Sequence, residues 1–144
     1  MKSLIEATEK LLADVVTFYF MSIGFHWNVE GQDFSQYHSL FQMIYEDVSD
    51  SVDGVAENIR KLDAYAPFDL SEYVKMTSLK LKDVDPSPKA MASALKEAND
   101  KVIETYMNVF KEAEKQDEQG FMDFLAGRID MHKKWAWMLR ASTK

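Results

Sequence analysis

Apolar side chains recur at spacings of three and four residues along four long stretches of the chain, and this pattern limits the fold more than any other feature. Residues with this spacing share one face of an α-helix, so each stretch predicts an amphipathic helix with one buried face. The stretches run from Leu4 to about Phe25, from about Phe34 to Leu62, from Met91 to Ala113 and from Phe124 to Leu139. Together they predict an all-α four-helix bundle.

The connections between these helices differ in length. Two are short, at Gly31 and at Gln116–Asp117, whereas the connection between the second and third helices is long and contains Pro67. Within it, Ser71 to about Lys80 predicts a short helix with Ser71 as its N-cap, and Asp83–Pro88 breaks the chain again. A connection of this length can cross the bundle from end to end, as in ferritin-like folds.

Composition excludes several classes of protein. With 5 Gly and 3 Pro, a turn-rich sandwich or barrel is disfavoured, and the absence of Cys excludes disulfides, thiolate metal sites and a Cys nucleophile. No apolar run reaches about 18 residues and no signal peptide is recognisable, so we expect no membrane partner and a cytoplasmic location. The net charge of −7 disfavours binding to nucleic acid and favours attraction of cations. We expect a single domain over residues 1–144.

Four carboxylates in the second helix lie within roughly 60° of one helix face, because they are spaced four, three and four residues apart. They belong to Glu46, Asp50, Asp53 and Glu57. Such a series is either a solvated surface or part of a metal site. His38 faces the same general direction as Asp53, but the two lie about 22 Å apart along the helix axis, whereas metal–ligand bonds are roughly 2 Å long. An antiparallel copy of the helix from a second subunit would bring them together, so a metal site here requires at least a dimer.

Several motifs resemble one known family. The stretches His26–Gly31 and Asp53–Arg60, with Phe34 and His38 between them, resemble the Dps proteins, the mini-ferritins named for DNA protection during starvation. The segment His132–Arg140 is similar to that family's last helix. The likeness covers nearly the whole chain. It implies a dodecameric hollow shell built from two-fold dimers, with a ferroxidase site at each dimer interface.

The resemblance also implies roles for individual residues. Trp27 would be an accessory residue beside the site that intercepts oxidising equivalents. The family usually has an acidic ligand four residues after its second histidine, and this chain has Gln42 there. A neutral amide brings no charge to a cation, so we expect a second iron to bind weakly or transiently, which leaves a di-iron and a mono-iron site both open. The implied iron ligands are His26 and His38 from one subunit and Asp53 and Glu57 from the other.

The sequence argues against an iron site inside the bundle. Such sites use Glu-x-x-His motifs, and the positions three residues before the histidines hold Ile23, Ser35 and Ile129. His132, beside two lysines on the last helix, is therefore expected to be structural.

Two further properties of the family can be compared with this chain. Its threefold pores are lined by acidic residues near the start of the last helix, so Asp123 and Asp130, which share a helix face, are pore candidates; the alternative is a solvated surface. Members that bind DNA commonly use a Lys-rich tail. This chain has only Lys2 before its first helix and is acidic, so we expect no DNA binding.

The expected function is that of an iron-storing mini-ferritin and ferroxidase. Fe(II) would bind between subunits, be oxidised by hydrogen peroxide in preference to oxygen, and be sequestered as ferric oxide inside the shell, which protects against oxidative damage. One alternative is a Dps-like shell with an impaired ferroxidase site that acts as a structural protein. Another is a DNA-compacting protein.

Overall fold

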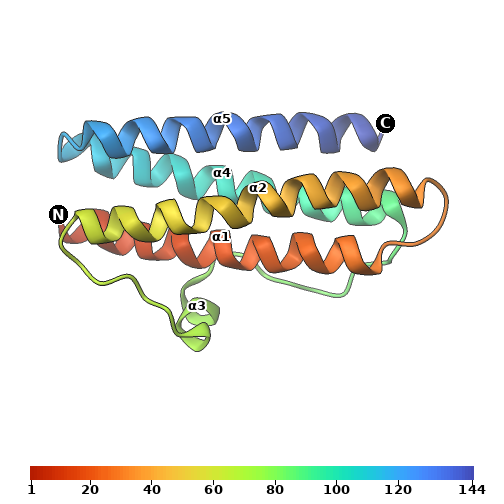
Figure 1. The fold of residues 1–144 in the computed structure, drawn as a ribbon, viewed down its shortest axis with the longest axis horizontal. Coiled ribbons are helices and arrows are strands. Elements are labelled where there is room, and N and C mark those ends of the chain that lie inside the picture. The colour runs from red at the N-terminus through yellow and green to blue at the C-terminus, as the bar shows by residue number, and fades with distance from the viewer.

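The structure, a computed structural model, describes residues 1–144 and consists of five α-helices (Figure 1). The all-α prediction is confirmed. The helices are α1 (Lys2–Asn28), α2 (Phe34–Lys61), α3 (Leu70–Met76), α4 (Pro88–Lys115) and α5 (Gln119–Ser142).

The four long helices form the predicted bundle, and α3 lies outside it in the connection between α2 and α4 (Figure 1). Helix α1 packs against α2 and α4, and α4 packs against α5. Because the connection returns along the length of the bundle, α2 and α4 run in the same direction, whereas α1 and α5 run in the opposite direction (Figure 1). The end-to-end crossover predicted from its length is therefore present.

The short helix differs from the prediction at both ends. It begins at Leu70 and its N-cap is Asp69, so the prediction of Ser71 as the cap is wrong. The Asp69 carboxylate accepts a hydrogen bond from the Ser71 backbone N–H at 2.9 Å, which satisfies one of the free donors of the first turn. The helix ends at Met76 rather than at about Lys80, because the next two residues bind α1 instead.

A buried carboxylate on α1 attaches the crossover to the bundle. Asp14 is fully buried and accepts hydrogen bonds from the Thr77 hydroxyl at 2.7 Å and from the Ser78 backbone N–H at 2.6 Å. Its other oxygen accepts from the Ser78 and Thr105 hydroxyls at 2.6 and 2.8 Å. A buried carboxylate needs such donors, so this one side chain fixes the crossover against both α1 and α4.

The core is one cluster of 25 buried apolar residues with members from all four long helices. Packing of these faces, rather than helix propensity alone, gives long helices most of their stability. No helix of this protein is both long and apolar enough to cross a membrane.

Candidate metal centre

His26 in the last turns of α1 and His38 in the first turns of α2 form a stacked pair. Their ring centroids are 3.7 Å apart and their planes differ by 14°. The His26 Nδ1 lies 2.8 Å from the His38 carbonyl oxygen, and the His38 Nδ1 lies 2.7 Å from the His26 carbonyl oxygen. The His26 carbonyl is one of the last four of α1, which lack partners within the helix, so the pair also completes the end of α1.

These hydrogen bonds determine which ring nitrogen can bind a metal. A carbonyl oxygen only accepts, so each Nδ1 carries the proton and donates it. The Nε2 atom of each ring is therefore the one that can offer a lone pair, the arrangement in which an imidazole serves as a metal ligand while its other nitrogen is oriented by a carbonyl. The structure thus provides two adjacent imidazoles with fixed tautomers.

Aromatic neighbours restrict the histidine rings further. The Phe34 ring stacks on His38 with centroids 4.9 Å apart, and the Tyr45 ring meets His26 edge-on at 5.1 Å. His26 is only 9% exposed. Trp27, by contrast, is 66% exposed. Its predicted accessory role stays a prediction.

The predicted carboxylate ligands lie elsewhere on the same chain. Asp53 and Glu57 are exposed on α2, and neither makes an ion pair within the chain. No group of three or more His, Cys, Asp or Glu side chains in the chain could hold a metal ion. One chain therefore does not bring the histidine pair and these carboxylates together, and the ligand set stays a prediction that requires a second copy.

Gln42 lies one helical turn after His38 on the exposed face of α2. Its amide nitrogen donates to the Glu46 carboxylate at 2.9 Å. The amide oxygen of Gln42 is left free of hydrogen bonds within the chain. At this position the protein offers a neutral oxygen rather than a carboxylate.

Gly54 allows α5 to lie very close to the part of α2 that carries Asp53. A Cβ on Gly54 would lie 2.6 and 2.9 Å from two ring carbons of Phe124. The Gly54→Ala variant is therefore expected to lose about 1–3 kcal/mol of unfolding free energy, because a packed ring must move. Gly127→Ala is the matched control, since nothing lies within 4 Å of its added Cβ. It should gain about 0.5–1 kcal/mol from helix propensity. Urea unfolding at one protein concentration measures both, and equal stability of the two variants would contradict this packing.

The pore candidates are both exposed on α5. Asp123 has no ion-pair partner in the chain. Asp130 lines a groove of 430 Å³ between α4 and α5, which Lys111 and Lys133 also line. The assignment to a pore stays a prediction.

A second polar cluster, the central polar network, lies inside the bundle and was not found from the sequence. Arg128 forms a bidentate ion pair with Asp47, with N···O distances of 2.8 and 2.9 Å. The Trp135 indole N–H donates to the same carboxylate at 2.8 Å. His132 is fully buried and hydrogen-bonded to Asn99 at 2.7 Å, in agreement with the structural role expected for it.

The sequence contains one signal for this network. Asp47 and Arg128 each follow an apolar core residue, Ile44 and Leu125, by three positions, so both lie near the buried face of their helix.

The charges of this network depend on one another. Burial by itself raises the pKa of Asp47, but the hydrogen bonds from Arg128 and Trp135 outweigh it and hold that pKa below its usual value. Burial, reinforced by the Arg128 charge, lowers the pKa of His132 to about 3. The network at neutral pH therefore contains one cation, one anion and a neutral imidazole.

The depressed pKa of His132 predicts acid sensitivity. Between pH 6.5 and about 3 the unfolded chain binds a proton at this histidine and the folded chain does not. The neutral His132 therefore contributes stability that is fully present above pH 6.5 and is lost as the pH falls from 6.5 toward 3. From pH 7 to pH 5 the wild type should lose about 2 kcal/mol more unfolding free energy than His132→Gln, at about 1.4 kcal/mol per pH unit. Urea unfolding of both proteins at the two pH values tests this. Parallel losses would show that His132 is protonated in the folded state.

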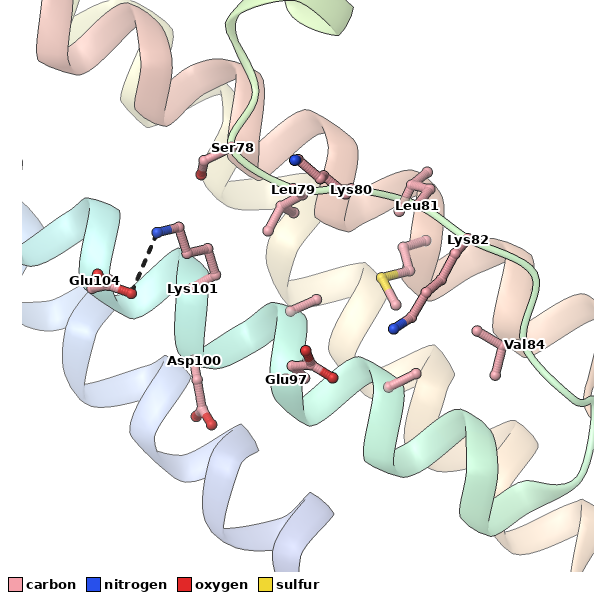
Figure 2. Close-up of a pocket in the computed structure, with 13 residues that line it drawn as sticks. Ser78, Leu79, Lys80, Leu81, Lys82, Val84, Glu97, Asp100, Lys101 and Glu104 are labelled. Atoms are coloured by element: carbon pink, nitrogen blue, oxygen red, sulfur yellow. Dashed lines mark ion pairs between the residues drawn. The ribbon is translucent and has the colours of Figure 1, made fainter.

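A cavity of 510 Å³ lies between the crossover and α4 (Figure 2). Its rim carries charges of both signs, including the Lys101–Glu104 ion pair at 3.6 Å. It contains no histidine, and of the chain's aspartates and glutamates only Glu97, Asp100 and Glu104 line it. The cavity is separate from the candidate metal centre.

Comparisons with known proteins agree with this architecture. The family model of the ferritin-like domain matches residues 5–144. The DNA protection during starvation protein of Helicobacter pylori is 29% identical over 143 residues, which cover 94% of this chain and 95% of that protein. An uncharacterized low temperature-induced protein of Nostoc sp. is 30% identical over 132 residues, 90% of this chain and 74% of that protein.

Solved structures extend the comparison. The Dps protein of Vibrio cholerae O1, described as a member of a broad superfamily of ferritin-like diiron-carboxylate proteins, superposes with a TM-score of 0.94 at 26% identity. The alignment covers 99% of this chain and 90% of that one. The Dps structure of Thermosynechococcus elongatus has the same TM-score of 0.94 at 20% identity, which shows the shared fold.

The fold and the matching family model place the chain in the ferritin-like family. Within that family it belongs to the Dps mini-ferritins, as its motifs suggested. At the level of the family, this membership implies iron storage and iron as the bound metal.

Proposed function

We propose that this protein is a ferroxidase that binds Fe(II) between two subunits, oxidises it with hydrogen peroxide and stores the ferric product inside a hollow shell. The observation that carries the proposal is the stacked His26–His38 pair, in which hydrogen bonds fix both Nδ1 atoms as donors and leave both Nε2 lone pairs available. The Nδ1 hydrogen bonds also complete the end of α1, so the support for a metal site lies in the two Nε2 lone pairs that they leave on adjacent rings.

The proposal requires an antiparallel copy of the chain. Asp53 and Glu57 are exposed and too far along α2 to reach the histidines of their own chain. Across a two-fold axis, the histidines of one subunit meet the carboxylates of the next and form two equivalent sites. Family membership supports a homo-oligomeric shell, and we propose a dodecamer.

The residues of this chain suit iron as a substrate. Imidazole and carboxylate together accommodate Fe(II), and carboxylate oxygens favour the Fe(III) that forms. Two Fe(II) ions reduce one hydrogen peroxide to two hydroxide ions, and both electrons are accounted for without release of a hydroxyl radical. Trp27, exposed beside His26 in the sequence, would supply an electron when only one Fe(II) is bound. Asp123 and Asp130 would guide Fe(II) inward.

A second candidate function is a shell whose site oxidises iron poorly. Gln42 supports it, because its amide adds no negative charge and its nitrogen already binds Glu46. A DNA-compacting role is less favoured, because the chain carries a net charge of −7 and phosphate would be repelled.

The two candidates are separated by anaerobic Fe(II) titration followed by a pulse of hydrogen peroxide. The ferroxidase is expected to bind Fe(II) at about one to two ions per subunit before the pulse, and ferric absorbance should then rise at once. Oxidation no faster than in buffer with the same iron and peroxide would leave only the shell.

A further inference from the structure

One nitrogen atom of a guanidinium inside the bundle contacts two side chains of the kinds that bind metal ions. The Nη2 of Arg128 lies 2.9 Å from Asp47 Oδ2 and 3.2 Å from His132 Nε2. It therefore lies between a carboxylate oxygen and an imidazole nitrogen, the two ligand types of the proposed iron site.

The hydrogen bonds of Asn99 establish that His132 Nε2 carries a lone pair. The Asn99 amide nitrogen donates to the His132 backbone carbonyl at 2.9 Å, so its side-chain oxygen is the atom that faces the ring. That oxygen lies 2.7 Å from His132 Nδ1 and can only accept, so Nδ1 carries the proton. Nε2 then accepts from Arg128.

The side chains around His132 Nε2 form a buried polar site. His132 and Tyr106 are both fully buried, and their ring centroids are 5.3 Å apart. The Tyr106 hydroxyl is buried without a hydrogen-bond partner in the chain. The His132 imidazole and the Tyr106 phenol thus lie together in the bundle core, and Arg128 joins the Asp47 carboxylate to that imidazole. The bundle core is the region in which ferritin-like di-iron proteins place their metal.

We propose that Arg128 is a built-in cation that closes the centre of this bundle to divalent metal ions. Its guanidinium neutralises Asp47, uses the lone pair of His132 and fills the space between them. A metal ion could enter only by displacing Arg128 from Asp47. The guanidinium would then be a second buried positive charge, beside the metal, without its carboxylate partner. Metal binding is thereby kept out of the bundle centre, away from Trp135 and Tyr106.

The test uses a protein in which the proposed intersubunit site has been removed. In the His26→Ala/Asp53→Ala background, Arg128→Ala leaves Asp47 and His132 facing a space without a cation. We expect this triple variant to bind about one additional Co(II) per chain, with visible absorption typical of mixed N and O ligation and with a melting temperature that rises with Co(II) concentration.

Two matched variants isolate the role of the charge and of the ligands. Arg128→Lys in the same background keeps a cation and should not bind the additional Co(II). Adding Asp47→Asn to the triple variant removes the carboxylate and should abolish the additional binding. Because the background lacks His26 and Asp53, the result does not depend on whether the proposed ferroxidase is correct.

The outcome is decisive even if Arg128→Ala weakens folding. A triple variant that is unfolded without metal and regains helical circular dichroism with Co(II) supports the inference. Metal that binds only to the folded state contributes its binding free energy to folding. A triple variant that neither binds additional Co(II) nor is stabilised by it overturns the inference. Equal Co(II) binding by the Arg128→Lys variant overturns it as well.

Discussion

Replacing His26 or Asp53 with alanine is expected to lower the rate of Fe(II) oxidation by more than about 100-fold, because loss of groups that only orient a metal ligand already costs about 10–100-fold. At each proposed site His26 comes from one subunit and Asp53 from the other. Each variant therefore removes one ligand from every site of the assembly. Ferric absorbance after a hydrogen peroxide pulse gives the rate, and Fe(II) bound beforehand gives the occupancy.

Asp50→Asn is the matched control for these variants. Asp50 is an exposed aspartate on the same helix, three residues before Asp53, and is outside the proposed ligand set. It should oxidise iron within about twofold of the wild type, since a surface charge outside the site contributes little. If Asp50→Asn and Asp53→Ala were equally impaired, general electrostatic attraction of iron rather than a defined site would explain the activity.

The largest expected effect on stability comes from Asp47→Ala. This change leaves the Arg128 guanidinium buried without its carboxylate and the Trp135 indole N–H without its acceptor. We expect a loss of about 3–5 kcal/mol in the free energy of unfolding, as for other broken buried ion pairs. Urea unfolding at pH 7 and at one fixed protein concentration measures it.

Asp100→Ala provides the comparison with an exposed ion pair. Lys96 and Asp100 are 2.8 Å apart, as close as Arg128 and Asp47, but the Asp100 side chain is 50% exposed. Its removal should cost at most about 1 kcal/mol. Equal losses in the two variants would show that burial of the Asp47–Arg128 pair has no energetic consequence.

The pH dependence of the Asp47 effect follows from the direction of its pKa shift. The folded-state pKa of Asp47 lies below its usual value of 3.8. The carboxylate therefore contributes stability that is fully present above pH 3.8 and is lost as the pH falls through the lower, folded-state pKa. The difference between wild type and Asp47→Ala should be constant from pH 7 to pH 5 and shrink only below about pH 4.

The bundle could be predicted from the sequence because its signals are local. Spacings of three and four residues define a helix without knowledge of its partners, and the length of the connection after Leu62 indicated a crossover. The end of α3 could not be predicted, because it depends on hydrogen bonds between Ser78 and Asp14, which lie 64 residues apart. The sequence does not distinguish the N-cap, because Asp69 and Ser71 are both good caps by residue type.

At the candidate site, too, local motifs could be predicted from the sequence and contacts between distant residues could not. His26 and His38 were identified from a motif, but their stacking and their reciprocal hydrogen bonds depend on how α1 meets α2. The pairing of Asp47 with Arg128 joins residues 81 positions apart, and isolated charged residues on an apolar helix face do not reveal their partners. Whether Asp53 and Glu57 are ligands depends on a second chain, which the sequence and structure of one chain do not contain.

Complementation between two inactive variants tests the intersubunit site most directly. His26→Ala and Asp53→Ala chains are co-expressed, and mixed assemblies are identified by mass. In each mixed dimer the site that combines the intact histidine with the intact aspartate is functional and the other is not. With random pairing we predict recovery of about one quarter of the wild-type rate per subunit. Mixed assemblies that stay as inactive as either parent would contradict a site shared between two subunits.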